Sequence, residues 1–135
     1  MAHEIFVDTS GFYALLVKED ATHEKAAEYL RNAAGKQRFL TTDYVLDETA
    51  TLLKARRHIE VLKPFFAAVL NSVACRVVWM DPEHFTAAQT FFLKHSDQDY
   101  SFTDCVSFLI MREQRIASAL TKDAHFLRAG FETLL

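Results

Sequence analysis

Short apolar runs alternate with longer amphipathic stretches along the whole chain. The apolar runs predict five short strands, at residues 5–8, 39–41, 76–80, 117–121 and 131–134. Between them, apolar residues three and four positions apart predict helices at residues 10–17, 23–34, 44–57, 60–73, 83–94, 101–114 and 124–128. Strands that alternate with helices predict an α/β fold, in which a mainly parallel sheet is covered by helices on both faces.

Local signals mark several helix ends. We expect Ser10, Asp43 and Ser101 to cap the helices that follow them, because short polar side chains can accept hydrogen bonds from free backbone amides. Gly35 is a natural stop for the second helix. The pair Asp81-Pro82 should end one strand and begin the next helix.

Length and composition fit one domain, spanning residues 1–135, with a single substantial core. Half of the residues are hydrophobic. The chain has only three glycines and two prolines, so we do not expect long loops. The formal net charge of −3 argues against a broadly basic surface for nucleic acid, although it allows a local basic patch.

The cysteines and the apolar runs indicate a cytoplasmic protein. Cys75 and Cys105 lie in apolar surroundings without metal-ligand spacing, so we expect buried, reduced thiols. The longest apolar runs, such as residues 65–70, are too short to span a membrane. Residues 1–4 lack the basic and apolar regions of a signal peptide.

Four separated acidic residues carry the candidate chemistry. Asp8 ends the first predicted strand, Asp123 follows a later one, Asp104 begins a very apolar helix, and Glu48 lies within a helix. Parallel α/β sheets bind ligands outside the carboxyl ends of their strands, where Asp8 and Asp123 should meet. Carboxylates gathered there repel one another and are tolerated mainly when a hard divalent cation binds between them.

Each of these residues also has an ordinary structural interpretation. Asp8 can be a turn former or a helix cap, and Asp123 can be a turn residue. Asp104 fits the third helical position of a capping box that begins at Ser101, which is compatible with a second role. His125 lies close to Asp123 in the sequence, but a lone histidine on a short helix is more often a surface or supporting residue.

Helical spacing distinguishes Glu48 from its neighbour Asp47. Val45, Glu48 and Leu52 share one helix face, whereas Asp47 aligns with Asp43 on a face that suits solvent. Glu48 is therefore the inward carboxylate, and an inward carboxylate needs a metal ion, an arginine or a proton as its partner.

Taken together, these segments resemble the PIN-domain nucleases and, within them, the VapC-type toxins of bacterial toxin–antitoxin pairs. The matching segments are residues 6–10 (Phe-Val-Asp-Thr-Ser), 47–49 (Asp-Glu-Thr), 101–104 (Ser-Phe-Thr-Asp), 120–126 (Leu-Thr-Lys-Asp-Ala-His-Phe) and 128–132 (Arg-Ala-Gly-Phe-Glu). Their order and spacing fit that family from end to end. Lys122 departs from it, because the position before the last aspartate is usually apolar or aromatic.

The resemblance implies a PIN-like three-layer α/β/α sandwich and an endoribonuclease that depends on Mg²⁺ or Mn²⁺. It also implies a small antitoxin partner and a homodimer. Carried over by position, the catalytic and metal-binding residues would be Asp8, Glu48, Asp104 and Asp123, supported by the polar groups of Thr9, Ser10 and Thr103. Candidates for holding the RNA backbone are Lys54, Arg56, Arg57, Arg112, Arg115 and Lys122, although most of them could equally form a solvated face.

Two other functional classes compete with this interpretation. Asp8 and Lys122 are compatible with catalysis through an aspartyl-phosphate. However, phosphatases of that class have the motif Asp-x-Asp after the first strand, and here Ser10 stands in the place of the second aspartate. A PIN-like module that binds RNA or protein without cutting is the other alternative. Four intact acidic positions argue against it, because mutually repelling carboxylates have little purpose without catalysis.

Overall fold

The computed structural model describes residues 3–135 of the chain. Its elements, in chain order, are β1 (His3–Val7), α1 (Thr9–Leu16), α2 (His23–Ala33), β2 (Gln37–Thr42), α3 (Asp43–Ala55), a 3₁₀ turn η1 (Ile59–Val61), α4 (Leu62–Leu70), β3 (Cys75–Val78), α5 (Pro82–Lys94), α6 (Phe102–Glu113), β4 (Ser118–Leu120), α7 (Ala124–Arg128) and β5 (Glu132–Thr133). All the predicted strands and helices are present, and the differences lie at their ends.

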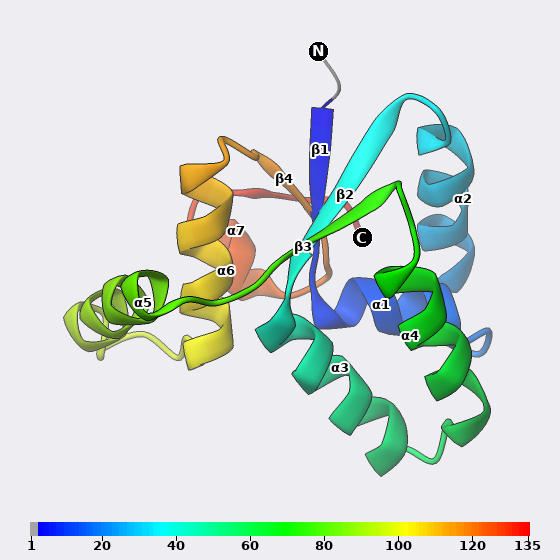
Figure 1. The fold of residues 1–135 in the computed structure, drawn as a ribbon, viewed down its shortest axis with the longest axis horizontal. Helices are drawn as coiled ribbons and strands as arrows, with labels where there is room; N and C mark the ends of the chain where they lie inside the picture. The colour runs from blue at the N-terminus through cyan, green and yellow to red at the C-terminus, as the bar shows by residue number, and fades with distance from the viewer. Residues whose placement is uncertain (1–2) are drawn as a thin grey trace.

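The strands form one parallel sheet in the order β3-β2-β1-β4-β5. Figure 1 shows α1, α2 and α4 on one side of this sheet and α6 and α7 on the other, with α5 lying outside α6. This is the predicted α/β/α sandwich. Because β1 pairs with β2 on one side and β4 on the other, the strand order reverses at β1, and such a reversal is where open α/β sheets bind ligands.

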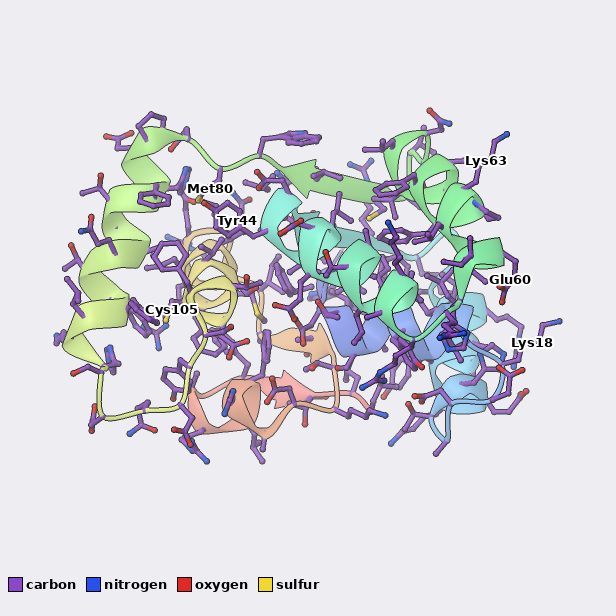
Figure 2. The ribbon with its side chains drawn as sticks, turned by 90° about the horizontal axis from the view of Figure 1, so that it is seen from below. Lys18, Tyr44, Glu60, Lys63, Met80 and Cys105 are labelled. Atoms are coloured by element: carbon purple, nitrogen blue, oxygen red, sulfur yellow. The ribbon has the colours of Figure 1, made fainter. Side chains whose placement is uncertain are left out.

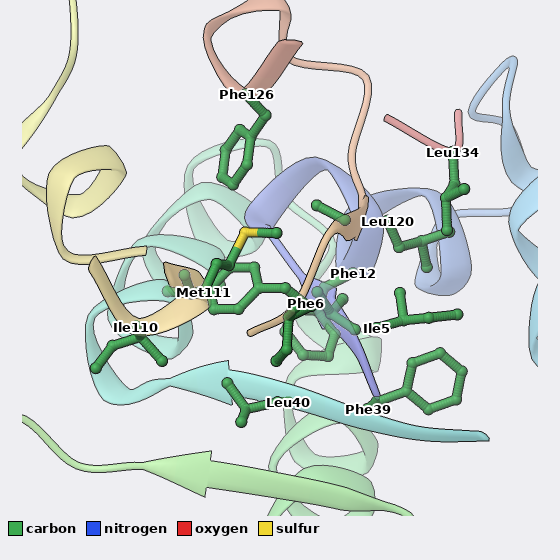
Figure 3. Close-up of a cluster of buried hydrophobic side chains, with 14 of the residues drawn as sticks. Ile5, Phe6, Phe12, Phe39, Leu40, Ile110, Met111, Leu120, Phe126 and Leu134 are labelled. Carbon is green, nitrogen blue, oxygen red and sulfur yellow. The ribbon is translucent and has the colours of Figure 1, made fainter. Parts of the chain in front are cut away.

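The core extends over both faces of the sheet, and the part nearest the acidic residues lies where α6 and α7 pack on the central strands (Figure 3). Helix α6 is buried on nearly every side, which matches its almost continuous apolar sequence. Phe108 from this helix is fully buried, and its ring meets the ring of Phe126 edge-on at 5.0 Å between centroids. These contacts fix the beginnings of α6 and α7 relative to the ends of β1 and β4, where the acidic residues lie.

The predicted cap at Ser10 is wrong. Helix α1 begins one residue earlier, at Thr9, with Asp8 in the N-cap position, because β1 ends at Val7 and the chain turns at once. The Asp8 side chain makes no capping hydrogen bond, so its carboxylate remains available to the site.

The predicted cap at Asp43 is also wrong. The Thr42 hydroxyl accepts a hydrogen bond from the backbone N–H of Val45 and caps α3, while Asp43 is the first helical residue. The Asp43 carboxylate instead accepts the backbone N–H of Met80 at 3.0 Å, and thereby ties the chain after β3 to the start of α3. Figure 2 looks from below onto this part of the molecule and labels Tyr44 and Met80 near each other.

The other predicted helix ends agree with the structure. Ser101 and Asp104 form a reciprocal capping box, Asp81 caps α5 through the backbone N–H of His84, and Gly35 has a φ of 75° just beyond α2. Both cysteines are free, as predicted. However, only Cys105 is buried, because Cys75 lies on the edge strand β3 and is half-exposed. In residues 3–135, no helix is long and apolar enough to cross a membrane.

Candidate active site

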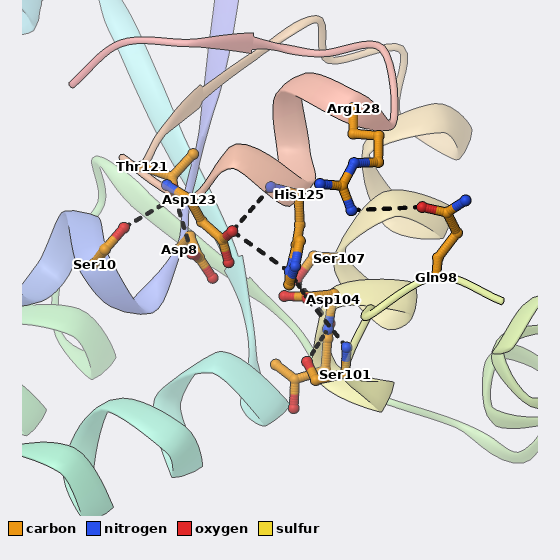
Figure 4. Close-up of polar contacts among 11 residues, drawn as sticks. Asp8, Ser10, Gln98, Ser101, Asp104, Ser107, Thr121, Asp123, His125 and Arg128 are labelled. Atoms are coloured by element: carbon orange, nitrogen blue, oxygen red, sulfur yellow. Dashed lines mark hydrogen bonds and ion pairs between the residues drawn. The ribbon is translucent and has the colours of Figure 1, made fainter. Parts of the chain in front are cut away.

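The structure brings the four predicted carboxylates to the carboxyl edge of the sheet, from four different elements. Figure 4 shows three of them, Asp8, Asp104 and Asp123. Asp8 lies between β1 and α1, Asp123 immediately before α7, Asp104 in the first turn of α6 and Glu48 on α3. They are close enough to act on one another, since the charges of Asp104 and Glu48 raise the pKa of Asp8, and the charge of Asp123 raises the pKa of both Asp104 and Glu48.

Asp8 is the most buried of the four, with only 4% of its surface exposed. Burial raises its pKa from an ordinary value of 3.8 to about 7. The Thr9 amide and the Thr121 hydroxyl oppose this rise but do not cancel it. In the absence of a bound cation, Asp8 is therefore the carboxylate that most readily takes up a proton near neutral pH.

A chain of hydroxyl groups holds the ends of β1 and β4 together. The Thr121 hydroxyl donates to the Asp8 carboxylate at 3.0 Å, and its oxygen accepts the backbone N–H of Asp123 at 3.0 Å. The Ser10 hydroxyl lies 2.9 Å from that of Thr121 and accepts the backbone N–H of Lys122 at 3.1 Å. Ser10 therefore supports the site by joining two loops. Thr121, which the sequence did not single out, is the centre of this network.

Asp104 is held from two sides. Its carboxylate accepts the Ser101 backbone N–H at 3.1 Å, and the Nδ1 atom of His125 lies 3.0 Å from the same oxygen. Burial raises the pKa of Asp104, and the Ser101 amide and His125 oppose that rise. His125 also lies 3.5 Å from the Asp123 carboxylate, so its imidazole bridges two members of the acidic set. The sequence feature that points to this role of His125 is its position two residues after Asp123, the N-cap residue of α7.

Glu48 faces the other carboxylates, as its helical spacing predicted, but it is exposed rather than buried. The reason is that it lies on the wall of an open cavity. Desolvation by that wall raises the pKa of Glu48, and the charge of Asp104 raises it further. The hydroxyls of Thr9 and Thr103 act in the opposite direction, which places both predicted supporting threonines beside Glu48.

The cavity itself has a volume of about 190 Å³ and is lined by Asp8, Glu48 and Asp123 together with the basic side chains of Arg56 and Lys122. Among the other basic candidates, Lys54 and Arg57 are exposed at the end of α3. The structure does not bring Arg112 and Arg115 to the site. Arg112 lies in the last turn of α6 and Arg115 just beyond its end, whereas Asp104 lies in the first turn, so most of the helix, at about 1.5 Å per residue, separates them from Asp104.

Arg112 and Arg115 have other surroundings. The Arg112 guanidinium stacks on the rings of Phe91 and Phe131, and Arg115 lines a cavity at the amino edge of the sheet with His3. Arg112 and Arg115 were predicted as RNA-backbone contacts, and the structure places both away from the acidic cavity.

The donor set suits a hard divalent cation. The acidic residues offer carboxylate oxygens, which Mg²⁺ and Mn²⁺ prefer, and neighbouring hydroxyls can bind water molecules of a hydrated ion. Ligand atoms of Asp104, Asp123 and His125 lie within 4.8 Å of one another. Burial is the main reason that the pKa values of Asp8, Glu48 and Asp104 are raised, and the neighbouring carboxylates raise them further, so a bound cation would favour the charged forms.

The fold and the site together are a parallel five-stranded sheet with a group of acidic residues at its carboxyl edge. The sequence matches the PIN-domain family over residues 5–132, and the chain belongs to that family.

Within the family, the chain groups with the VapC proteins. It is 37% identical over 133 residues to the 23S rRNA-specific endonuclease VapC20 of Mycobacterium tuberculosis, an alignment that covers 94% of this chain and 95% of VapC20. The crystal structure of that protein, described as a sarcin–ricin loop cleaving toxin, superposes on this chain with a TM-score of 0.83 and 36% identity. The superposition covers 94% of this chain and 95% of that one. VapBC2 from Rickettsia felis, bound to a DNA fragment from their promoter, shares the fold alone, with a TM-score of 0.69 and 10% identity over 96% of each chain.

Proposed function

We propose that this protein is a metal-dependent endoribonuclease, the toxin of a toxin–antitoxin pair, built as one PIN domain over residues 1–135. The observation that carries the proposal is the convergence of Asp8, Glu48, Asp104 and Asp123 at the point where the strand order of the sheet reverses. A binding module gains nothing from burying Asp8 among other carboxylates, whereas a metal-dependent nuclease requires such a set.

The substrate we propose is 23S ribosomal RNA, at its sarcin–ricin loop. The support is the 37% identity to VapC20, which is named for that RNA and spans nearly the same length. The site is compatible with a looped RNA, because the cavity is open and places two basic side chains, Arg56 and Lys122, beside the acidic residues. A looped RNA exposes unstacked bases, which a regular duplex does not.

The acidic residues would have the following roles. Asp8 and Asp104 would hold a Mg²⁺ or Mn²⁺ ion directly or through water, and Glu48 and Asp123 would complete its surroundings. When bound, such an ion polarises the scissile phosphate and lowers the pKa of water. Glu48, which faces the open cavity, is placed to orient the attacking water and accept its proton.

The supporting groups fix this arrangement. Thr121 and Ser10 hold Asp8 and the loop of Asp123 at one separation, and the Ser101 capping box holds Asp104. His125 donates to or accepts from Asp104 according to its tautomer, and so sets the orientation of that carboxylate. Arg56 and Lys122 would contact the RNA backbone and offset the negative potential of the site.

We further propose a small antitoxin and a second copy of this chain as partners, in the cytoplasm. An acidic cavity open to solvent suits an inhibitory basic side chain, because an arginine can pair with two carboxylate oxygens at once. For the homodimer, the support is a group of exposed apolar side chains on and beside α5, namely Trp79, Phe85, Phe92 and Leu93. Exposed apolar groups gathered in this way are typical of protein–protein contacts.

Cleavage of purified ribosomes or total RNA tests the proposal. The wild-type protein, incubated with Mg²⁺, Mn²⁺ or EDTA, should produce discrete 23S fragments only with metal. Asp8→Asn and Asp104→Asn should abolish them while circular dichroism remains unchanged. Asp47→Asn is the matched control, because Asp47 is an exposed carboxylate next to Glu48 that does not line the cavity.

The outcomes separate the competing classes. Metal-dependent fragments that persist in both site variants would contradict the assigned residues. RNA binding without cleavage, under every metal condition, would favour the non-cutting PIN-like module. A phosphorylated Asp8 adduct, trapped from a phosphate ester, would favour the phosphatase class.

A further inference from the structure

A second cavity opens beside the acidic one and shares part of its wall. We call it the side chamber, and its volume is about 390 Å³, which is within the usual ~300–1,000 Å³ of ligand sites. Tyr13, Arg56 and Lys122 line both the acidic cavity and the side chamber, so the two spaces adjoin. His58 and Asp20 line the side chamber but not the acidic cavity.

One wall of the side chamber is a fixed stack of three side chains. The Tyr13 hydroxyl lies 3.1 Å from Nε2 of His58, and the Arg56 guanidinium lies 4.9 Å from the centre of the Tyr13 ring. The chain reaches this position through a left-handed turn at Arg57, whose φ is 64°, and the His58 backbone N–H then donates to Leu53 O at 2.8 Å. Glycine usually occupies such a turn, because other residues adopt it at a cost of about 1–2 kcal/mol.

Lys122 forms the partition between the two cavities. Its ammonium lies 3.2 Å from the Asp20 carboxylate, and its backbone N–H donates to the Ser10 hydroxyl in the active-site network. Asp20 is itself fixed, since it accepts the backbone N–H and the hydroxyl of Thr22 at 2.9 and 2.6 Å. The Lys122 ammonium is therefore held where both cavities meet.

Charge distinguishes Arg56 from Lys122. Lys122 is paired with Asp20, whereas among residues 3–135 no carboxylate lies within salt-bridge distance of Arg56. The Arg56 guanidinium is exposed, stacked on an aromatic ring and next to an acidic cavity that phosphate would otherwise avoid. Its planar fork suits a phosphate group.

We propose that the side chamber binds the nucleotide next to the scissile phosphate. Arg56 contacts the phosphate of this nucleotide, and Lys122 contacts the RNA backbone where the two cavities meet. The Tyr13–His58 pair forms hydrogen bonds with the sugar and the base. The inference rests on the proposed ribonuclease function. An RNA strand whose scissile phosphate lies in the acidic cavity must continue into an adjoining space. The side chamber adjoins that cavity through shared walls and supplies the cation and the polar groups that a nucleotide needs.

Binding of a fluorescently labelled sarcin–ricin stem-loop RNA tests this inference. Every variant is made in the Asp8→Asn background, so that binding is measured without cleavage, and the salt concentration is varied. Arg56→Ala should weaken binding about tenfold and lower the slope of log Kd against log salt by about 0.7, the value for one phosphate contact to a single strand. Tyr13→Phe removes one hydroxyl group and should weaken binding about two- to tenfold without changing the slope.

Arg38→Ala is the matched control, because Arg38 is exposed near the amino end of β2, at the other edge of the sheet. It should change neither the Kd nor the slope. In the cleaving protein, Arg56→Ala and Tyr13→Phe should raise KM and leave kcat nearly unchanged, which separates positioning from chemistry and from misfolding.

The failures of the two proposals can be told apart. If the wild-type protein cleaves the RNA but Arg56→Ala and Tyr13→Phe match the Arg38→Ala control, the side chamber does not hold the substrate and the inference is overturned. If the wild-type protein neither binds nor cleaves RNA, the proposed function fails and the inference fails with it. Weakened binding of a protein partner, with RNA binding unchanged, would also overturn it.

Discussion

The hydroxyl group of Thr121 donates a hydrogen bond of 3.0 Å to the carboxylate of Asp8, across the boundary between β4 and β1. Thr121 is completely buried and follows the last residue of β4. One side chain thus links the carboxylate after the first strand to the loop that carries Asp123. The separation of these two carboxylates is therefore set by the sheet itself rather than by a flexible loop.

Replacing Thr121 with valine should damage the site without changing its shape. Valine matches the size of threonine but leaves the Asp8 carboxylate and the Asp123 amide without their partner, which should lower the free energy of unfolding by about 1–3 kcal/mol. Urea denaturation measures this loss. Mg²⁺ affinity, measured by calorimetry, should fall as well.

Thr86→Val is the control for that experiment, because the Thr86 hydroxyl bonds only within its own helix and is exposed. It should leave stability and metal affinity close to wild type. Equal behaviour of the two variants would show that the Thr121 network does not organise the site.

The stability of the metal-free protein should decrease as pH rises from about 4 to 7. Asp8 in the folded protein has a pKa of about 7, above its ordinary value of 3.8, so the folded state binds a proton that the unfolded state has lost in this interval. The raised pKa values of Glu48 and Asp104 act in the same direction. Urea unfolding in EDTA, repeated between pH 5 and 8.5, measures the trend.

Asp8→Asn isolates the contribution of Asp8 to this trend. The variant should be more stable than wild type in EDTA at pH 8, and the difference should shrink toward pH 5, where Asp8 is already protonated. Adding Mg²⁺ at pH 8 should stabilise the wild type more than the variant, because a ligand of the folded state adds stability according to its affinity. A wild type that is the more stable protein in EDTA at pH 8 would contradict the assignment.

His125→Ala should affect the metal-free protein more than the metal-loaded one. The His125 imidazole lies between the Asp104 and Asp123 carboxylates, at 3.0 and 3.5 Å, and it lessens their repulsion when no cation is present. A bound Mg²⁺ ion would take over that role. Thermal unfolding with EDTA and with Mg²⁺ compares the two states, and an equal loss in both would show that His125 serves only to pack the fold.

Much of the fold could be predicted because its signals are local. The all-round apolar character of residues 105–111 identified a central helix, and the Ser101 capping box identified its beginning. The carboxyl-edge rule for parallel sheets then brought Asp8 and Asp123 together before any coordinates were known. For these residues, local sequence and overall topology point to the same place.

The parts that could not be predicted depend on contacts between distant segments. Thr121 matters because β4 lies beside β1, and Tyr13 meets His58 because a left-handed turn at Arg57 folds the chain back. The predicted caps at Ser10 and Asp43 were misplaced by two residues and by one residue, because several adjacent polar residues can serve as a cap and tertiary contacts decide among them. The distance of Arg112 and Arg115 from the site, by contrast, follows from the length of α6, because Asp104 lies in its first turn and both arginines lie at or beyond its last turn.

Gly11 provides the last prediction, because it marks the closest approach of α1 to the sheet. A Cβ atom at Gly11 would collide with the carbonyl oxygen of Leu120, the final residue of β4. In a helix, Gly→Ala ordinarily adds about 1 kcal/mol of stability. Here α1 would have to move away from β4, so we expect Gly11→Ala to lower the free energy of unfolding by about 1–3 kcal/mol instead.

The same displacement should also lower activity, since Asp8 and Ser10 closely precede Gly11 and both bond to Thr121. Urea denaturation and the RNA cleavage assay measure the two effects in one preparation. Ala87 lies on the exposed face of α5, so Ala87→Gly measures the ordinary effect of an alanine–glycine exchange on helix stability. This variant should leave cleavage unchanged. A Gly11→Ala protein that is more stable than wild type and equally active would show that α1 can move without disturbing the carboxylates, and that the position of Asp8 is set by β1 alone.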